Sequence, residues 1–378
     1  LTGGKTGEVT LNSDGGANSV TLSSSATSLK VSGAENLTLA GTTAQTTVDA
    51  SGATGTFAMT SDGTKAVSIT GSAGADTITM TGSNALTDTI SLGAGADKVT
   101  FTANLADADI VDGGDGTDTV VGTSANLAAL TSAATTSNLT NFEVVQVSNQ
   151  SGADLDVSDI QEDGITTVNL AHSGANLASG ARQITGEAGS LTVNLGKSAA
   201  GNTGALGGTL TVTDGADAVA TDDSVTINNT AVNSTTGANL NLNAALTSTG
   251  YENVTFNTGA GSGNTEQTIG TITVTADAAT AATTLTLKGG NAIDVGTQVT
   301  TNSTAGITVD GSGLTAQAAG TTSMDLDTVA AGAGATVTIT GSGGDDIFGD
   351  SSAGVNTTLA TTINAGAGAD SIFTGAGA

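Results

Sequence analysis

Aspartates recur at a fixed interval in one stretch of this chain, each two residues after a glycine and two before an apolar residue. The aspartates and glycines keep one spacing of 21 residues: Asp76, Asp97, Asp118, Gly74, Gly95 and Gly116. Asp88 and Asp109 are also 21 residues apart. Carboxylate and carbonyl oxygens are the ligands that Ca²⁺ prefers, about 6–8 of them per ion. The pattern therefore predicts calcium binding by stacked turns.

Apolar residues keep the same interval and show which elements must position the aspartates. Two columns each recur every 21 residues: Val48, Ile69, Ile90 and Val111, and Phe57, Ile78, Val99 and Val120. Each cycle thus holds two short strands separated by turns. Equivalent strands of a solenoid stack about 4.8 Å apart, which places equivalent side chains in columns. We expect an all-β fold, a right-handed parallel β-solenoid or β-roll with calcium-binding turns and longer, irregular coils in the middle of the chain.

The segment GGDGTDTVV (113–121) matches the nonapeptide G-G-x-G-x-D-x-U-x, in which U is a large apolar residue. It adds Asp115 to the candidate ligands. GSAGADTIT (71–79) departs from the pattern at Ser72. Two carboxylates about 5 Å apart repel by roughly 3 kcal/mol at an effective dielectric near 20. A bridging dication reverses that sign, so we expect this block to be loose without Ca²⁺ and ordered with it.

A second set of such turns lies near the end of the sequence, in GSGGDDIFG (341–349) and AGAGADSIF (365–373). Its candidate calcium ligands are Asp345, Asp346 and Asp370. We expect three regions: a solenoid over 1–121 with a calcium block at 71–121, an irregular β-rich region over 122–336, and a second calcium block over 337–378. The segment 126–136 is the best helix candidate. Glu35, Glu143 and Glu252 each stand just ahead of an apolar strand.

Composition excludes several classes of protein. The chain has 378 residues, no Cys, Pro or Trp, and a net charge of −28 from 35 acidic and seven basic residues. Nucleic acid is not an expected partner, because phosphate binding needs a basic face; membrane insertion is not expected either. The single histidine, His172, cannot build a two-His zinc site, and we expect no enzymatic activity. The pairs Glu162–Asp163 and Asp222–Asp223 read as solvated, and TDGAD (213–217) as an ordinary turn.

The nonapeptides resemble those of repeats-in-toxin (RTX) calcium-binding β-rolls. The wider pattern is similar to surface-layer proteins of Gram-negative bacteria, which follow a GGDGTD-type repeat with a strand led by Phe-Glu, as residues 113–147 do. That resemblance implies an extracellular, cell-surface location and export by type I secretion with an uncleaved C-terminal signal. It also implies self-assembly into a lattice or filament of identical subunits. The end, TGAGA (374–378), opens another repeat, so we expect the sequence to stop inside one.

Three functions fit these observations. The first is a structural component of a bacterial surface layer, with Ca²⁺ as its ion and with other copies of itself and a cell-surface polysaccharide as partners. The second is the stalk of a secreted adhesin. The third is the non-catalytic repeat region of a secreted hydrolase.

Overall fold

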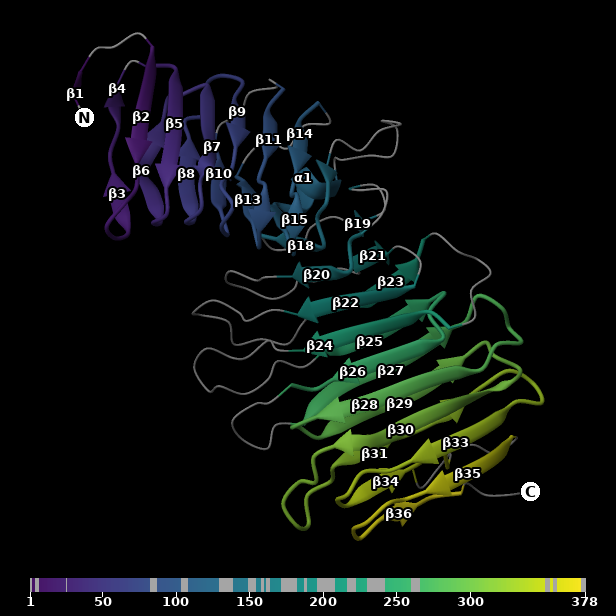
Figure 1. Cartoon of the computed structure of the whole chain (residues 1–378). Helices are drawn as coiled ribbons and strands as arrows, with labels where there is room; N and C mark the ends of the chain where they lie inside the picture. Colours follow the sequence, from purple (N-terminus) through teal and green to yellow (C-terminus); the bar gives the residue numbers. More distant parts are fainter. Residues whose placement is uncertain are drawn as a thin grey trace. The chain divides into compact units, whose positions relative to one another are not determined.

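The regular secondary structure of the computed structural model is almost entirely β-strand (Figure 1). It describes these residues: 2–3, 7–24, 26–81, 87–102, 108–128, 139–148, 154–157, 160, 164–170, 182–186, 189–195, 208–215, 222–229, 242–259, 266–350, 354–355 and 359–374. The chain divides into two compact units. Unit 1 comprises residues 1–149 and 157–165, and unit 2 comprises 150–156 and 166–378. Within each unit the strands are parallel, which confirms the predicted all-β parallel solenoid.

Two long parallel sheets form most of unit 1, and each coil contributes one strand to each of them; β1 (Thr2–Gly3) and β4 (Ser23–Ser24) form a separate short pair. The first sheet runs in the order β17 (Leu139–Thr140), β14 (Ile110–Asp112), β11 (Thr89–Ser91), β9 (Ser68–Thr70), β7 (Thr47–Ala53), β5 (Ser28–Gly33) and β2 (Glu8–Asn12). The second contains β3 (Asn18–Val20), β6 (Leu37–Thr43), β8 (Phe57–Ser61), β10 (Thr77–Met80), β13 (Lys98–Phe101), β16 (Thr119–Gly122) and β18 (Val144–Val147). A short pair, β12 (Ala94–Gly95) and β15 (Asp115–Gly116), links two turns.

The 21-residue register is observed over most of the predicted block. Ile90 pairs with Ile69 and with Val111, and Val99 pairs with Val120. The predicted alignment of Phe57 with Ile78 is wrong, because Ile78 pairs with Met59 instead. A shift of two residues leaves the same strand face buried, so the apolar pattern cannot distinguish the two registers. Phe57 consequently occupies the position that aspartate takes in later coils.

The core of unit 1 is a set of aliphatic columns between its two sheets. Ile69, Ile90 and Val111 are at most 2% exposed, as are Ile78 and Val99. Each buried aliphatic side chain contributes roughly 1.5–3 kcal/mol, so stability accumulates coil by coil. Threonine and serine alternate with these residues on the outward strand positions. The columns thus hold the turns between the sheets in register.

Two parallel sheets also form unit 2. One contains β20 (Thr167–Leu170), β22 (Ser190–Leu195), β24 (Ser224–Asn229), β26 (Asn253–Asn257), β28 (Thr283–Gly289), β30 (Gly306–Leu314), β33 (Thr336–Thr340) and β35 (Ala360–Asn364). The other contains β19 (Leu155–Asp156), β21 (Arg182–Gly186), β23 (Leu210–Asp214), β25 (Leu242–Thr249), β27 (Gln267–Thr275), β29 (Ile293–Thr301), β31 (Met324–Leu326), β34 (Asp346–Phe348) and β36 (Ser371–Ile372). In addition, β32 (Val329–Ala330) pairs with β29.

Coil length varies in unit 2, as expected for the middle of the chain. Paired residues are 34 positions apart for Leu191 and Val225 but 24 apart for Leu285 and Val309. The strands β16 and β33 run across the boundaries predicted after residues 121 and 336. Parallel pairing therefore continues from coil to coil although the number of residues per coil differs, with register shifts in three of the pairs.

The only helix in the described part of the chain is α1 (Ser124–Ala128). It overlaps the start of the helix predicted over 126–136, whose remainder from residue 129 lies outside the described residues. His172 and the Glu162–Asp163 pair lie outside them as well. Of the helices that the structure describes, none has the length and apolarity needed to cross a membrane.

Candidate metal centre

The aspartates spaced 21 residues apart form a continuous ladder at one turn of unit 1, just before β10, β13 and β16. Oδ1 of Asp97 accepts a hydrogen bond from the backbone N–H of Asp76, at 2.7 Å. Oδ1 of Asp118 accepts one from the N–H of Asp97, also at 2.7 Å. Asp76 does the same for Phe57, and Oε2 of Glu143 does so for Asp118. We call these four acidic residues the aspartate ladder.

The three aspartates of the ladder are buried, and two of their oxygens accept no hydrogen bond within the described part of the chain. Asp76, Asp97 and Asp118 are at most 1% exposed. Oδ2 of Asp97 and Oδ2 of Asp118 accept no hydrogen bond from any described residue. A buried carboxylate oxygen without a partner costs several kcal/mol unless a cation or a proton compensates it. These two oxygens therefore mark where a cation is needed.

Asp76 differs from Asp97 and Asp118 because Ser72 donates hydrogen bonds to both of its carboxylate oxygens. The N–H of Ser72 donates to Oδ2 of Asp76 at 2.6 Å, and the Ser72 hydroxyl donates to Oδ1 at 2.5 Å. Ser72 stands where the nonapeptide has its second glycine. Ser72 thus changes the chemistry of the turn. It donates to both carboxylate oxygens of Asp76, whereas the Oδ2 atoms of Asp97 and Asp118 in the next two coils accept no hydrogen bond from the described residues.

The electrostatics of the ladder favour neutralisation. Burial raises the pKa of Asp97 to about 6, and the charges of Asp76 and Asp118 add to the increase. Burial also raises the pKa of Asp118, followed by the charges of Glu143, Asp112 and Asp115. A carboxyl group with a pKa near 6 is still mostly ionised at pH 7. The folded chain therefore holds buried negative charge at neutral pH.

Glycines let successive turns approach closely around these carboxylates. A Cβ atom on Gly113 would lie 2.9 Å from Oδ2 of Asp118, and one on Gly114 would lie 1.9 Å from the carbonyl oxygen of Gly93. Gly93 and Gly114 have φ values of 104° and 92°, a region that favours glycine. Gly95 and Gly116 also have positive φ, whereas Gly74 does not, so the turn at 71–76 has a different backbone conformation.

The donor set fits a hard cation. The groups at the two open positions are carboxylate oxygens, with neither thiol nor imidazole among the described residues nearby, and Ca²⁺ prefers such ligands. Asp97 and Asp118 would hold the ion, and the charges of Glu143 and Asp112 would add to its attraction. When bound, Ca²⁺ would supply the positive charge that joins neighbouring coils. The side chains themselves hold the backbone N–H groups of the preceding coil.

A second ladder lies at the opposite turn of unit 1. Oδ1 of Asp88 accepts a hydrogen bond from the N–H of Val67, and Oδ1 of Asp109 accepts one from the N–H of Asp88, each at 2.9 Å. The two aspartates are 8% and 1% exposed. Burial and the charge of Asp109 raise the pKa of Asp88. Their stacking is present, and their role as calcium ligands stays a prediction.

The other predicted ligands lie in less uniform surroundings. Asp115 is exposed at the tip of the turn that carries Asp118. Each oxygen of Asp345 accepts a backbone N–H, from Gly320 at 3.0 Å and from Ala369 at 2.8 Å, and these bonds lower its pKa. The protein thus already engages both Asp345 oxygens, and calcium ligation by Asp115 or Asp345 stays a prediction.

The turn at 341–346 repeats the arrangement of the turn at 71–76. The N–H and hydroxyl of Ser342 donate to the two oxygens of Asp346, each at 2.7 Å. The N–H of Asp346 donates to Oδ1 of Asp370 at 3.0 Å. Gly366 and Gly368 have positive φ, as Gly93 and Gly95 do. In both blocks, therefore, a turn in which a serine donates to the aspartate precedes a turn whose glycines have positive φ.

Sequence reasoning did not assign Glu143, Ser72 or Ser342 to the site. Glu143 was expected only as a marker before a strand, yet it supplies the last position of the aspartate ladder. The signal was its place after the last nonapeptide of the first block, immediately before a strand, β18, that continues the same sheet. The two serines share a sequence signal as well, since each precedes its aspartate by four residues.

Comparison with known protein families matches residues 105–126 and 357–378 to the RTX calcium-binding nonapeptide repeat. The matched segments contain Asp109, Asp115, Asp118 and Asp370. Comparisons with curated proteins and with solved structures found no match. The chain therefore contains RTX calcium-binding repeats, one set in each of its two units.

Proposed function

We propose that this chain is a structural, calcium-binding component of a bacterial surface layer. The observation that carries the calcium part is the pair of buried oxygens, Oδ2 of Asp97 and Oδ2 of Asp118, in coils that lie in or next to a matched RTX repeat. The protein's work is mechanical in this proposal. It has no catalytic role, and the ion makes a stack of thin coils rigid.

Calcium acts on the coils through the charge of the ladder. Without the ion, Asp97 and Asp118 repel each other in a buried place, and burial opposes their ionisation. With the ion, the same charges attract it and hold the two coils together. Extracellular calcium modules bind their ion with dissociation constants of about 10⁻⁴–10⁻³ M, so such a site fills outside a cell. The calcium-binding coils would then become ordered outside the cell, where the protein acts.

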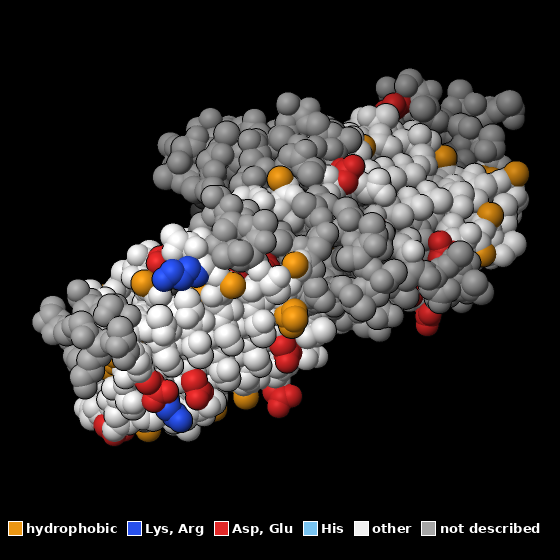
Figure 2. All heavy atoms as spheres, turned by 90° about the horizontal axis from the view of Figure 1, so that it is seen from above, with side chains coloured by type: hydrophobic (Ala, Val, Ile, Leu, Met, Phe, Trp, Pro, Cys, Tyr) orange, Lys and Arg blue, Asp and Glu red, His pale blue; other side chains and the backbone are white. Residues whose placement is uncertain are grey.

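Several features support a place at the cell surface. RTX repeats are typical of secreted proteins, and the absence of Cys suits a bacterial chain that folds outside the cell without disulfides. On the face drawn in Figure 2, uncharged polar side chains and backbone dominate, with acidic groups scattered among them. A net charge of −28 keeps subunits apart until cations screen it. Calcium would thus also control contacts between copies, and between the lattice and a cell-surface polysaccharide.

The matched repeats also support two alternative functions, because such repeats are shared with secreted adhesins and hydrolases. In an adhesin, the calcium solenoid would be a stalk that presents a binding domain. In a hydrolase, it would support a catalytic domain encoded elsewhere in the gene. Both alternatives keep the calcium solenoid and lose the lattice.

Electron microscopy of the full chain tests the proposal. We expect a two-dimensional lattice or filaments in Ca²⁺ and dispersed particles in a chelator. The variant Asp97→Asn/Asp118→Asn should assemble poorly, and Asp14→Asn, at an exposed turn of unit 1, should assemble normally. Monomers that bind carbohydrate arrays in Ca²⁺ would instead support an adhesin stalk. An upstream protease or lipase motif in the gene would support the hydrolase.

A further inference from the structure

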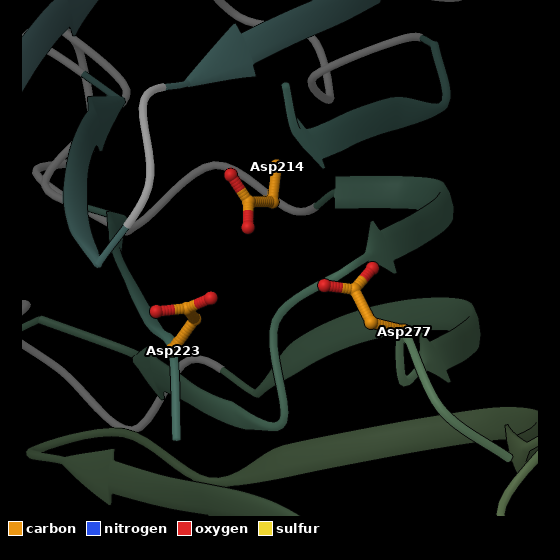
Figure 3. A group of neighbouring side chains, drawn as sticks. All are labelled: Asp214, Asp223 and Asp277. Carbon is orange, nitrogen blue, oxygen red and sulfur yellow. The ribbon is translucent and has the colours of Figure 1, made fainter. Parts of the chain in front are cut away.

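Three acidic residues outside the nonapeptides converge in unit 2 (Figure 3). One carboxylate oxygen from each of Asp214, Asp223 and Asp277 lies within 4.8 Å of the others. Asp214 is the last residue of β23, Asp223 directly precedes β24, and Asp277 follows β27 by two residues. The cluster therefore brings the turn between the consecutive strands β23 and β24 together with the end of β27, which lies two coils later.

Asp223 contributes a buried carboxylate oxygen that no group in the described residues hydrogen-bonds. Its residue is 4% exposed, and its Oδ2 atom accepts no hydrogen bond from the described residues. In Figure 3 its carboxylate points into the space between the three side chains. The expectation that Asp222 and Asp223 are both solvated is wrong for Asp223, while Asp222 is exposed. A buried, ionised carboxylate without a partner is costly, and a cation offsets that cost.

A glycine makes the convergence possible. In the sheet order, β25 lies between β23 and β27, so Asp214 and Asp277 belong to coils on either side of the β25 coil. Gly250 follows β25, and its N–H donates to the carbonyl of Thr275 at 2.7 Å. A Cβ on Gly250 would lie 2.6 Å from Cβ of Asp214 and 3.1 Å from Oδ1 of Asp277. Only a residue without a side chain leaves room for the two aspartates to approach.

Glu252 adds a fourth acidic group beside the cluster. It is 1% exposed, and its Oε1 accepts a hydrogen bond from the N–H of Asp277 at 3.1 Å. Its Oε2 accepts none from the described residues. The surroundings of the three aspartates are thus strongly negative.

We propose that Asp214, Asp223 and Asp277 bind one calcium ion that joins the two coils of unit 2 on either side of the β25 coil. The donors are all carboxylate oxygens, which suits a hard dication. Ca²⁺ accepts irregular geometry and a range of coordination numbers, whereas Mg²⁺ demands a near-ideal octahedron. Unlike the ladder in unit 1, this site depends on no repeat, because its ligands come from coils of unequal length. Only the identity of the ion as calcium rests on the function proposed above; the site itself does not.

The chain offers a site-specific probe in its single tyrosine. Tyr251 directly follows Gly250 and is fully buried, and the chain has no Trp. Terbium occupies calcium sites, and its emission is sensitised by an excited tyrosine only at short range. Terbium bound at Asp214, Asp223 and Asp277 should therefore emit on excitation of Tyr251, and the variant Asp97→Asn distinguishes this signal from terbium bound at the ladder of unit 1.

We expect saturable, tyrosine-sensitised terbium emission from the full chain, displaced by Ca²⁺. Asp223→Asn should abolish it, and Asp277→Asn should weaken terbium binding at least about tenfold, because charge count sets affinity at such sites. Asp277 is exposed, so its substitution should leave the circular dichroism spectrum unchanged and decides the matter if Asp223→Asn fails to fold. The matched control Asp222→Asn should bind terbium normally.

Several results would overturn the proposal. One is the absence of sensitised emission from the unaltered chain, or emission that excess Ca²⁺ does not displace. Another is emission that Asp277→Asn leaves unchanged. Asp97→Asn separates this site from the proposed function: it should reduce calcium bound at the ladder and preserve the Tyr251-sensitised signal. Loss of that signal in Asp97→Asn would show that the site is not independent and would also overturn the proposal.

Discussion

Replacing Asp97 by asparagine should change the stability of the chain in opposite directions with and without calcium. In the ion-free protein, the pKa of Asp97 is about 6 against an ordinary value of 3.8. At about 1.36 kcal/mol per pKa unit, ionising this group at pH 7 costs the folded state about 3 kcal/mol. Asparagine removes that cost and keeps the acceptor for the N–H of Asp76. Its buried NH₂ group brings a new cost of about 1–3 kcal/mol.

In a chelator, Asp97→Asn should therefore be neutral or up to about 2 kcal/mol more stable than the unaltered chain. In calcium the sign reverses. An ion present at 100 times its dissociation constant stabilises the folded state by about 2.7 kcal/mol, and removal of a charged ligand forfeits most of that gain. The difference between the two conditions is the contribution of the ion.

Thermal unfolding followed by circular dichroism, at pH 7 with a chelator and with Ca²⁺, measures both values. Asp14→Asn, an exposed turn residue of the same unit, serves as the control and should respond to Ca²⁺ as the unaltered chain does. Equal destabilisation of Asp97→Asn in both conditions would refute the reasoning, because it would show that the carboxylate only holds the backbone. So would an unaltered chain whose unfolding Ca²⁺ does not shift.

Three further predictions follow from the same contacts. Because burial raises the pKa of Asp97 and of Asp325 to about 6, their neutral forms favour the folded state, so the chelated protein should lose stability as pH rises from 3.8 to above 6; unfolding scans across that range check this, and a rise in stability would contradict it. Ser72→Ala should cost about 1.5–3 kcal/mol equally with and without Ca²⁺ in denaturant unfolding, because it removes a hydrogen bond to the Asp76 carboxylate; a calcium-dependent loss would contradict the account of that turn. Gly114→Ala should destabilise the fold by more than about 1 kcal/mol, since φ is 92° and the new Cβ would clash with the carbonyl oxygen of Gly93. Calorimetry should also show weaker calcium binding by this variant; unchanged binding would argue against close stacking of the turns.

The coil period could be predicted from the sequence because three kinds of residue repeat it independently. Glycine, aspartate and apolar residues must each return to the same place when coils stack, so their common interval fixed the register of Asp97 and Asp118. The register of Phe57 could not be predicted, because a slip of two residues keeps the same face buried. Only the aspartate that bonds its N–H distinguishes the two alignments.

The cluster in unit 2 could not be predicted for a different reason. Asp214, Asp223 and Asp277 share no interval, and their approach depends on coil lengths and on the space beside Gly250. Local sequence shows only that TDGAD favours a turn. Contacts between coils of unequal length become visible only when the strand pairing is known.

A crystal structure of the full chain grown in Ca²⁺, with anomalous scattering used to locate the ions, tests the central claim most directly. The account predicts a calcium ion bound to Oδ2 of Asp97 and Oδ2 of Asp118. Clear density at saturating Ca²⁺ in which protein groups alone surround both oxygens would contradict it.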